Sequence, residues 1–225
     1  MNRFFVNQKD EDYFILDAKT LKHLNVIRIN SDPFICIYQE KFYKCILEYN
    51  RAKVIEEINE NHEFDFEVVV GVSLIKYERF EWALQKLVEL GASKIIPMIT
   101  NYTNGELYKF DKFQKKLERF KTIIQNAAEQ SFRNKIPELG PLTKFEDILK
   151  LNNYQIFIAH EKENCNNLIP NDITVNTLFL VGPEGGFSED EVFKAIELGA
   201  KPVSLGKRIL RAETAAIYMM SKIKN

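Results

Sequence analysis

Two glycine-bearing segments near the C-terminus carry the residues best suited to ligand chemistry in this sequence. The first segment, 180–192, reads LVGPEGGFSEDEV, and the second, 205–215, reads LGKRILRAETA. Five of the nine glycines fall between positions 182 and 206, just after apolar runs typical of buried strands. Glycine lets the backbone approach a ligand closely or adopt a positive φ, so such loops at strand ends predict a binding pocket.

The glycine pattern does not match the common nucleotide-binding signatures. GPEGG at 182–186 is not a GxGxxG fingerprint, and the chain has no Walker A sequence, which argues against a nucleoside triphosphate. A tight turn that needs two glycines would also explain the first loop taken alone. The second loop is followed by Lys207, Arg208 and Arg211, and two adjacent strand ends would form one pocket.

Apolar periodicity predicts a change of architecture near residues 66–72. Before it, aromatic and β-branched runs at 34–38, 42–47 and 53–55 predict a small β-barrel or sheet. After it, strands alternate with helices, which implies a mainly parallel sheet covered on both faces. The strands are expected at 64–72, 95–99, 155–159, 177–181 and 202–205, and the helices at 78–90, about 110–131, after the Ser188–Glu191 capping box, and from near Glu213.

Composition sets the broad class of the protein. The 225 residues are 45% hydrophobic and 28% charged, as in soluble globular proteins, and no apolar run approaches the ~20 residues of a membrane-spanning helix. The N-terminal ten residues have too short an apolar stretch for a signal peptide, so a cytoplasmic protein is expected. Three cysteines without a CxxC pair argue against a disulfide framework or a structural metal.

The net charge of −1 is unevenly distributed. Residues 76–135 carry 12 Lys or Arg against 7 Asp or Glu, and residues 201–225 carry 6 against 1, so each stretch has a charge of +5. Residues 136–200 carry 4 against 11, a charge of −7. If the two basic stretches share a face, an anionic partner is expected, although solvated helix faces would give the same pattern.

Several motifs together resemble the bacterial 16S rRNA (uracil-N3)-methyltransferase family, which belongs to the SPOUT class. Besides the two glycine segments, these are ELG at 89–91 after QK, AEQSFR at 128–133, RFF at 3–5 and HLNVIR at 23–28. The chain departs from the family at Tyr102, where an arginine is common, and in lacking a glycine after Arg28. The resemblance spans essentially the full length.

The resemblance implies an α/β fold with two domains and S-adenosylmethionine as the cofactor. Residues 1–66 would form a PUA-like β-barrel that binds RNA, and residues 67–225 a SPOUT methyltransferase domain with a C-terminal trefoil knot. It also implies a homodimer that acts on 16S rRNA of the small ribosomal subunit, with no metal and no membrane. By carry-over, the cofactor would be held by Leu180, Gly182, Glu184, Gly185, Gly186, Leu205, Gly206, Ile209 and Leu210.

Catalytic and RNA-binding residues follow from the chemistry that this resemblance implies. Methylating uracil N3 leaves negative charge on the base, and Arg211 is the leading candidate to stabilise it, unless it pairs with Glu213 or a phosphate. Glu129 and Arg133 lie one helical turn apart and could orient the base, or form a surface ion pair. The residues expected to contact RNA are Arg3, Arg28, Lys76 and Arg208.

Two other functions remain compatible with these motifs. A SPOUT enzyme could act on another RNA, such as tRNA or 23S rRNA. A non-catalytic RNA-binding or ribosome-assembly protein could keep the fold without the chemistry, although the intact glycine loops disfavour this. His23, His62 and His160 form no obvious constellation, so none is assigned as a base.

Overall fold

The computed structural model describes residues 1–29, 32–161 and 167–224, which divide into two compact units. The first unit contains residues 1–63 and 128–136, and the second contains residues 64–127 and 137–225. The segment 128–136, which begins within helix α3 (Leu117–Gln130), thus belongs with the N-terminal residues. Sequence patterns, which predict two continuous domains, did not include this segment in the first unit.

The first unit is built on a six-stranded sheet in the order β1-β4-β5-β6-β3-β2. Strand β1 pairs in parallel with β4, and all other neighbours are antiparallel. A bulge between Lys44 and Cys45 interrupts the register of β5 with β6, and such bulges increase the local twist of a strand. Its elements are β1 (Arg3–Phe5), β2 (Lys9–Asp10), β3 (Tyr13–Ile15), α1 (Ala18–Val26), β4 (Phe34–Tyr38), β5 (Lys41–Glu48) and β6 (Arg51–Ile58).

Alternating apolar residues give this sheet its core. Phe14, Phe34 and Cys36 are fully buried, and Leu24 of α1 packs into the same cluster. A smaller cluster of Ile35, Ile37 and Phe42 is contacted by Phe132. The three N-terminal runs read from the sequence are therefore confirmed as strands.

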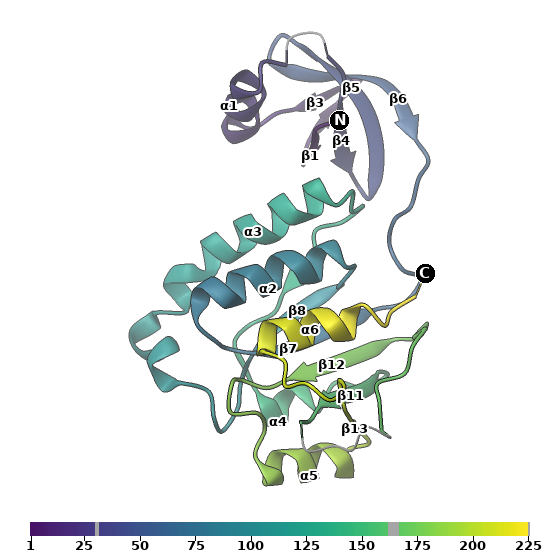
Figure 1. The fold of residues 1–225 in the computed structure, drawn as a ribbon. Helices are drawn as coiled ribbons and strands as arrows, with labels where there is room; N and C mark the ends of the chain where they lie inside the picture. Colours follow the sequence, from purple (N-terminus) through teal and green to yellow (C-terminus); the bar gives the residue numbers. More distant parts are fainter. Residues whose placement is uncertain (30–31, 162–166, 225) are drawn as a thin grey trace. The chain divides into compact units, whose positions relative to one another are not determined.

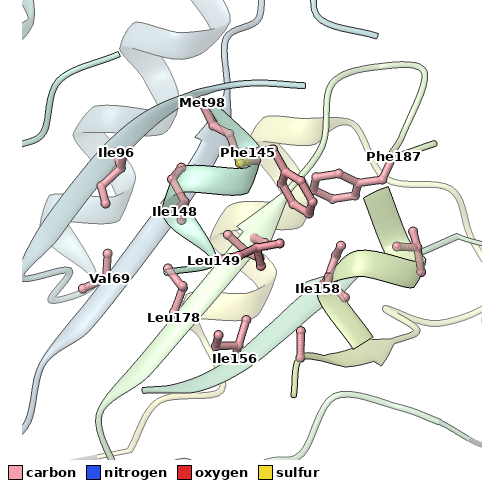
Figure 2. Close-up of a cluster of buried hydrophobic side chains, with 14 residues drawn as sticks. Val69, Ile96, Met98, Phe145, Ile148, Leu149, Ile156, Ile158, Leu178 and Phe187 are labelled. Atoms are coloured by element: carbon pink, nitrogen blue, oxygen red, sulfur yellow. The ribbon is translucent and has the colours of Figure 1, made fainter. Parts of the chain in front are cut away.

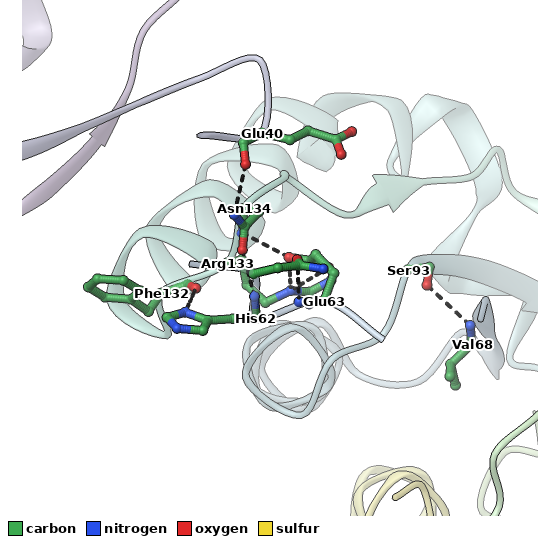
Figure 3. A network of polar contacts seen from close by, with 9 residues as sticks. Glu40, His62, Glu63, Val68, Ser93, Phe132, Arg133 and Asn134 are labelled. Carbon is green, nitrogen blue, oxygen red and sulfur yellow. Dashed lines mark hydrogen bonds and ion pairs between the residues drawn. The ribbon is translucent and has the colours of Figure 1, made fainter. Parts of the chain in front are cut away.

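Segment 132–134 is held in the first unit by a buried polar network (Figure 3). The Arg133 guanidinium pairs with the Glu63 carboxylate, with Nη2 2.6 Å from Oε2 and Nε 2.9 Å from Oε1. The Asn134 N–H donates to the same carboxylate at 2.8 Å, and its side-chain amide donates to the carbonyl of Glu40 at 2.7 Å. His62 Nδ1 lies 2.7 Å from the carbonyl oxygen of Phe132.

The second unit contains a parallel sheet in the order β10-β8-β7-β12-β11-β13, with β9 paired to β8 beside β10. Every strand pair in it is parallel, as the alternation of strands and helices predicts. Its elements are β7 (Val68–Ser73), α2 (Tyr77–Glu89), β8 (Lys94–Ile99), β9 (Glu138–Leu139), β10 (Thr143–Lys144), α4 (Phe145–Ile148), β11 (Gln155–Ala159), β12 (Thr177–Val181), α5 (Glu189–Glu197), β13 (Lys201–Val203) and α6 (Ala212–Met220).

Helices cover both faces of the parallel sheet (Figure 1). On one face, α2 packs against α6, and α6 contacts β7 and β12. On the other, Phe145 and Ile148 of α4 and Val192 of α5 join a buried cluster with Ile158 and Leu178 of the sheet (Figure 2). Burying apolar side chains on both faces explains why β7 and β12 are continuous apolar runs.

The helix predicted at about 110–131 begins later in the structure. Residues 105–116 form three short 3₁₀ turns, at Gly105–Leu107, Lys109–Asp111 and Gln114–Lys116, and the α-helix starts at Leu117. Phe110 and Asp111, in the second of these turns, have the left-handed φ values of 49° and 56°, so a continuous α-helix cannot run through them. The spacing of Phe113, Leu117 and Phe120 predicted the helical face but not this break.

Candidate active site

A pocket of about 590 Å³ opens where three neighbouring strands of the parallel sheet end. Strands β12, β11 and β13 are adjacent in this order and end at Val181, Ala159 and Val203. The walls come from residues 159–161, 181–190 and 204–210, together with Tyr102 and the start of α6. The volume falls in the range of small-ligand sites, roughly 300–1,000 Å³.

The loop after β12 is a tight turn that needs glycine at two positions. The Gly186 N–H donates to the carbonyl of Pro183 at 2.9 Å, and Gly186 has a φ of +71°. A Cβ on Gly182 would lie 3.0 Å from the carbonyl carbon of Gly186, which is tighter than ordinary packing. The backbone of this turn therefore forms the pocket wall itself, as a ligand held by backbone groups requires.

Helix α5 begins directly behind this turn. The Ser188 side chain accepts from the Glu191 N–H at 3.3 Å, and the Glu191 carboxylate accepts from the Ser188 N–H at 2.8 Å. The predicted capping box is thus confirmed, and the helix is followed by Gly199 with a φ of +87°. Reciprocal capping satisfies two N–H groups that the helix start would leave unpaired.

The loop after β13 supplies apolar and basic side chains. Gly206 has a φ of +108°, and its N–H donates to the Ser204 hydroxyl at 3.3 Å. Ile209 is 83% exposed although it lines the pocket, and Lys207 and Arg208 are exposed beside it. A large apolar side chain left in solvent at a pocket edge is suited to contact a ligand or a second chain.

Arg79 of α2 connects the glycine turn to the start of α6. Its guanidinium Nη1 lies 3.1 Å from Glu184 Oε1, and its Nε lies 3.9 Å from Glu213 Oε1. Glu213, on the first turn of α6, is only 6% exposed. The sequence left open an ion pair between Arg211 and Glu213. In the structure, the partner of Glu213 is Arg79.

Comparison with known proteins identifies the fold and the family. The sequence profile of the RNA methyltransferase domain matches residues 62–224. The chain belongs to this RNA methyltransferase family. The ribosomal RNA small subunit methyltransferase E of Mesomycoplasma hyopneumoniae is 39% identical over 99% of this chain and 98% of its own length. The corresponding protein of Bacillus subtilis is 34% identical over 99% and 96%.

A solved structure from the same family has the same fold. The ribosomal RNA small subunit methyltransferase E from Neisseria gonorrhoeae, crystallised with S-adenosyl methionine bound, superimposes with a TM-score of 0.83. The match covers 98% of this chain and 96% of that chain at 29% identity. The family therefore has this mixed α/β architecture over both units.

Eight of the nine residues predicted for the cofactor line the pocket. The exception is Leu180, which is fully buried in the core cluster between the sheet and α4. Its position one residue before the strand end places it on a covered face of the sheet, so it supports the pocket from within the core. The eight lining residues are Gly182, Glu184, Gly185, Gly186, Leu205, Gly206, Ile209 and Leu210.

Sequence patterns missed the part of the pocket that lies beyond the two glycine loops. Ala159, His160 and Glu161 line it because β11 lies between β12 and β13. Their position directly after an apolar strand could have predicted that they line the pocket, but this segment contains no glycine that would have drawn attention to it. Tyr102, from the loop after β8, completes this set.

The three predicted catalytic residues are divided between the two units: Arg211 belongs to the second, and Glu129 and Arg133 belong to the first. Arg211 is exposed at the N-cap of α6, between Leu210 and Ala212, which both line the pocket. Arg133 is 3% exposed and belongs to the buried network of the first unit. The Glu129 carboxylate accepts from the Phe5 N–H at 3.3 Å in that same unit.

The predicted RNA-binding residues differ in whether their side chains are free to contact RNA or are engaged within the protein. Arg28, Lys76 and Arg208 are exposed, and Arg28 follows α1 with a φ of +56°. Arg3 instead donates to the carbonyl oxygens of Glu129 and Gln130 at 3.1 and 2.7 Å. Its guanidinium carbon also lies 4.2 Å from the centre of the Phe132 ring. Through these contacts, Arg3 connects strand β1 to the segment 129–132 within the first unit.

Within residues 1–29, 32–161 and 167–224, no three His, Cys, Asp or Glu side chains are grouped so as to hold a metal ion. No helix there is long and apolar enough to cross a membrane.

Replacing Gly186 with valine is expected to weaken S-adenosylmethionine binding by at least ~10-fold. A β-branched residue resists a φ of +71°, so the turn that forms the pocket wall should change shape. Gly199→Val is the matched control, because Gly199 has a φ of +87° but lies outside the pocket lining. Calorimetric titration of both variants with S-adenosylmethionine tests this, and circular dichroism verifies folding. If Gly186→Val bound the cofactor as tightly as Gly199→Val, the turn would not be part of the binding site.

Proposed function

We propose that this protein transfers a methyl group from S-adenosylmethionine to N3 of a specific uridine in 16S rRNA of the small ribosomal subunit. The observation that carries the proposal is the pocket at three strand ends, formed by both glycine loops, in a chain that matches its family over nearly its whole length. Activity on ribosomal RNA also favours a cytoplasmic location.

The residues present fit the proposed cofactor. The turn at Gly182–Gly186 is so tight that a Cβ on Gly182 would lie 3.0 Å from the backbone of Gly186, so backbone rather than side chains forms this wall of the pocket. The apolar side chains of Leu205 and Leu210 suit the nucleoside part, and Glu161 adds negative charge to the lining, which suits a sulfonium. The cofactor, when bound, supplies an electrophilic methyl group.

The protein's own contribution would be positioning and electrostatics. Uracil N3 must release its proton to water, to which the pocket is open, before it attacks; the resulting negative charge spreads over the neighbouring oxygens of the base. Arg211 could donate to those oxygens from the edge of the pocket, and the N-terminal turn of α6 favours negative charge nearby. Together they would stabilise the anion.

The finer fold assignments belong to the same proposal. We assign a PUA-like barrel to residues 1–66 and a SPOUT domain with a trefoil knot to residues 67–225. The mostly antiparallel first sheet and the wholly parallel second sheet support this division. The first domain would bind RNA through Arg28, while Lys76 and Arg208 would contact RNA from the second.

Arg28→Ala is expected to weaken RNA binding and to lower the salt dependence of the binding constant by about one counterion. The reason is that one exposed cation, and therefore one phosphate contact, is lost. Cofactor affinity should not change. Binding of small subunits over a salt series, with the neutral Asn25→Ala as control, tests this; an unchanged salt dependence would remove Arg28 from the RNA-binding surface.

A homodimer is expected in solution at micromolar concentration. A second copy would cover apolar side chains that one chain leaves exposed, such as Trp82 (46%) and Ile209 (83%). Met219 and Met220 of α6 are buried within the chain, so they would not contribute to that interface. Light scattering measures the mass directly, and a monomeric value would contradict the dimer.

The decisive experiment is mass spectrometry of 16S rRNA from a strain that lacks this gene. Loss of 3-methyluridine, restored by the gene, is the expected result. An unchanged 16S rRNA with a modification lost from tRNA or 23S rRNA would favour another RNA substrate. A protein that binds subunits but takes up no S-adenosylmethionine would instead be a non-catalytic ribosome-assembly factor.

A further inference from the structure

We propose that Tyr102 is the platform on which the uracil to be methylated stacks, an inference that rests on the proposed function. Tyr102 lines the pocket, and 56% of its surface is exposed. Leaving an aromatic ring uncovered in a pocket brings no packing benefit to the fold. Proteins hold unstacked RNA bases on such rings, because every base has a π face.

The backbone on both sides of Tyr102 is fixed by buried hydroxyl groups. Thr103 Oγ1 accepts from the Thr100 N–H at 2.8 Å and lies 2.8 Å from the hydroxyl of Ser73 at the end of β7. All three of these residues are at most 8% exposed. The turn that carries the ring is therefore attached to the sheet.

A second attachment ties the same turn to helix α5. The Asn101 N–H donates to Glu191 Oε1 at 2.8 Å, and the Asn101 side-chain amide donates to the Ser188 hydroxyl at 2.8 Å. Glu191 is 3% exposed, so the hydrogen bond from the Asn101 N–H to its carboxylate is partly shielded from water. A ring whose supports are buried while its face is open is preorganised for a ligand.

Tyr102 also lies against the glycine turn that would hold the methyl donor. A Cβ on Gly185 would be 3.3 Å from Tyr102 Cβ and 3.5 Å from two carbons of its ring. A base stacked on this ring would thus be next to the turn. Methyl transfer requires such proximity of the two reacting groups.

The adenine of the cofactor is the other planar group that could use this ring. The exposure of Tyr102 favours the RNA base as its partner. A side chain on a residue that is more than half exposed can be reached from solvent by a large substrate such as RNA. The half-buried Leu205 and Leu210 offer the cofactor more enclosed apolar surface. The test below separates the two.

The test compares Tyr102→Phe, which keeps a planar ring, with Tyr102→Leu, which keeps apolar bulk without a π face. We expect Tyr102→Phe to retain kcat/KM for small subunits lacking the mark within about 3-fold. Tyr102→Leu should lose about 10-fold or more, in line with the loss of a stacked base. Phe193→Leu, at a 62% exposed ring on α5 outside the pocket, should have no effect.

Cofactor affinity measured by calorimetry should be the same for all four proteins. If Tyr102→Leu kept wild-type kcat/KM, or lost cofactor affinity by the same factor as kcat/KM, stacking of the RNA base on Tyr102 would be refuted. In either case an active wild-type protein would leave the proposed function standing. A wild-type protein that methylates no 16S rRNA would overturn the proposed function and this inference together.

Discussion

Arg133→Ala should lower the free energy of unfolding of the first unit by about 3–5 kcal/mol, the usual effect of removing one partner from a buried ion pair. The Arg133 side chain is 3% exposed and that of Glu63 9%, and their closest atoms are 2.6 Å apart. Without the guanidinium, the Glu63 carboxylate would stay buried and would keep the hydrogen bond from the Asn134 N–H, but it would lose its ion-pair partner (Figure 3).

The pH dependence gives this prediction a second readout. Burial by itself would raise the pKa of Glu63, but the hydrogen bonds and charge of Arg133 outweigh burial and hold it below its ordinary value. A lowered folded-state pKa contributes stability above the unfolded-state pKa, and the contribution is lost as the pH falls through the folded-state value. The difference between wild type and Arg133→Ala should therefore be largest near neutral pH and shrink in acid.

Urea denaturation followed by circular dichroism measures the effect. The single tryptophan, Trp82, lies in the second unit, so its fluorescence would not report on the first. Lys41→Ala is the matched control, because Lys41 pairs with Glu57 at 2.7 Å in the first unit while 58% of its side chain is exposed, and it should destabilise the protein far less. Equal destabilisation by the two variants would contradict a structural role for Arg133.

Arg211→Ala should reduce the single-turnover rate of methyl transfer by ~10²-fold or more. Its side chain is exposed at the N-cap of α6, and both of its neighbours line the pocket. A donor aimed at charge that develops in the transition state has about this effect when removed. RNA affinity should fall only modestly, because one of several cations is lost.

The rate is measured with labelled S-adenosylmethionine and small subunits that lack the mark, under saturating conditions. Arg211→Lys should recover part of the rate, since it keeps the charge but not the planar pair of donors. Arg208→Ala is the control for charge near the pocket and should change RNA affinity more than the rate. A full rate for Arg211→Ala would show that another group stabilises the anion.

The sequence by itself determined the local units of the second domain. The apolar run at Thr177–Val181, the glycine turn and the Ser188 capping box are signals carried by adjacent residues, and the structure has each of them in place. The resemblance to the methyltransferase family rests on those same motifs, and the family comparison confirms it. Eight of the nine cofactor residues carried over from that resemblance line the pocket, and all eight lie in the two glycine loops.

The tertiary structure alone decided which distant segments share a site. His160 and Tyr102 join the pocket because of the order β8-β7-β12-β11-β13, and strand order depends on how whole strands pack rather than on local pattern. Leu180 is a core residue for a related reason. Whether the side chains on one face of a strand are buried depends on the helices that pack against that face. Arg133 pairs with Glu63, which lies 70 residues away in the sequence. Only the folded chain therefore shows that the charge of Arg133 is buried and paired.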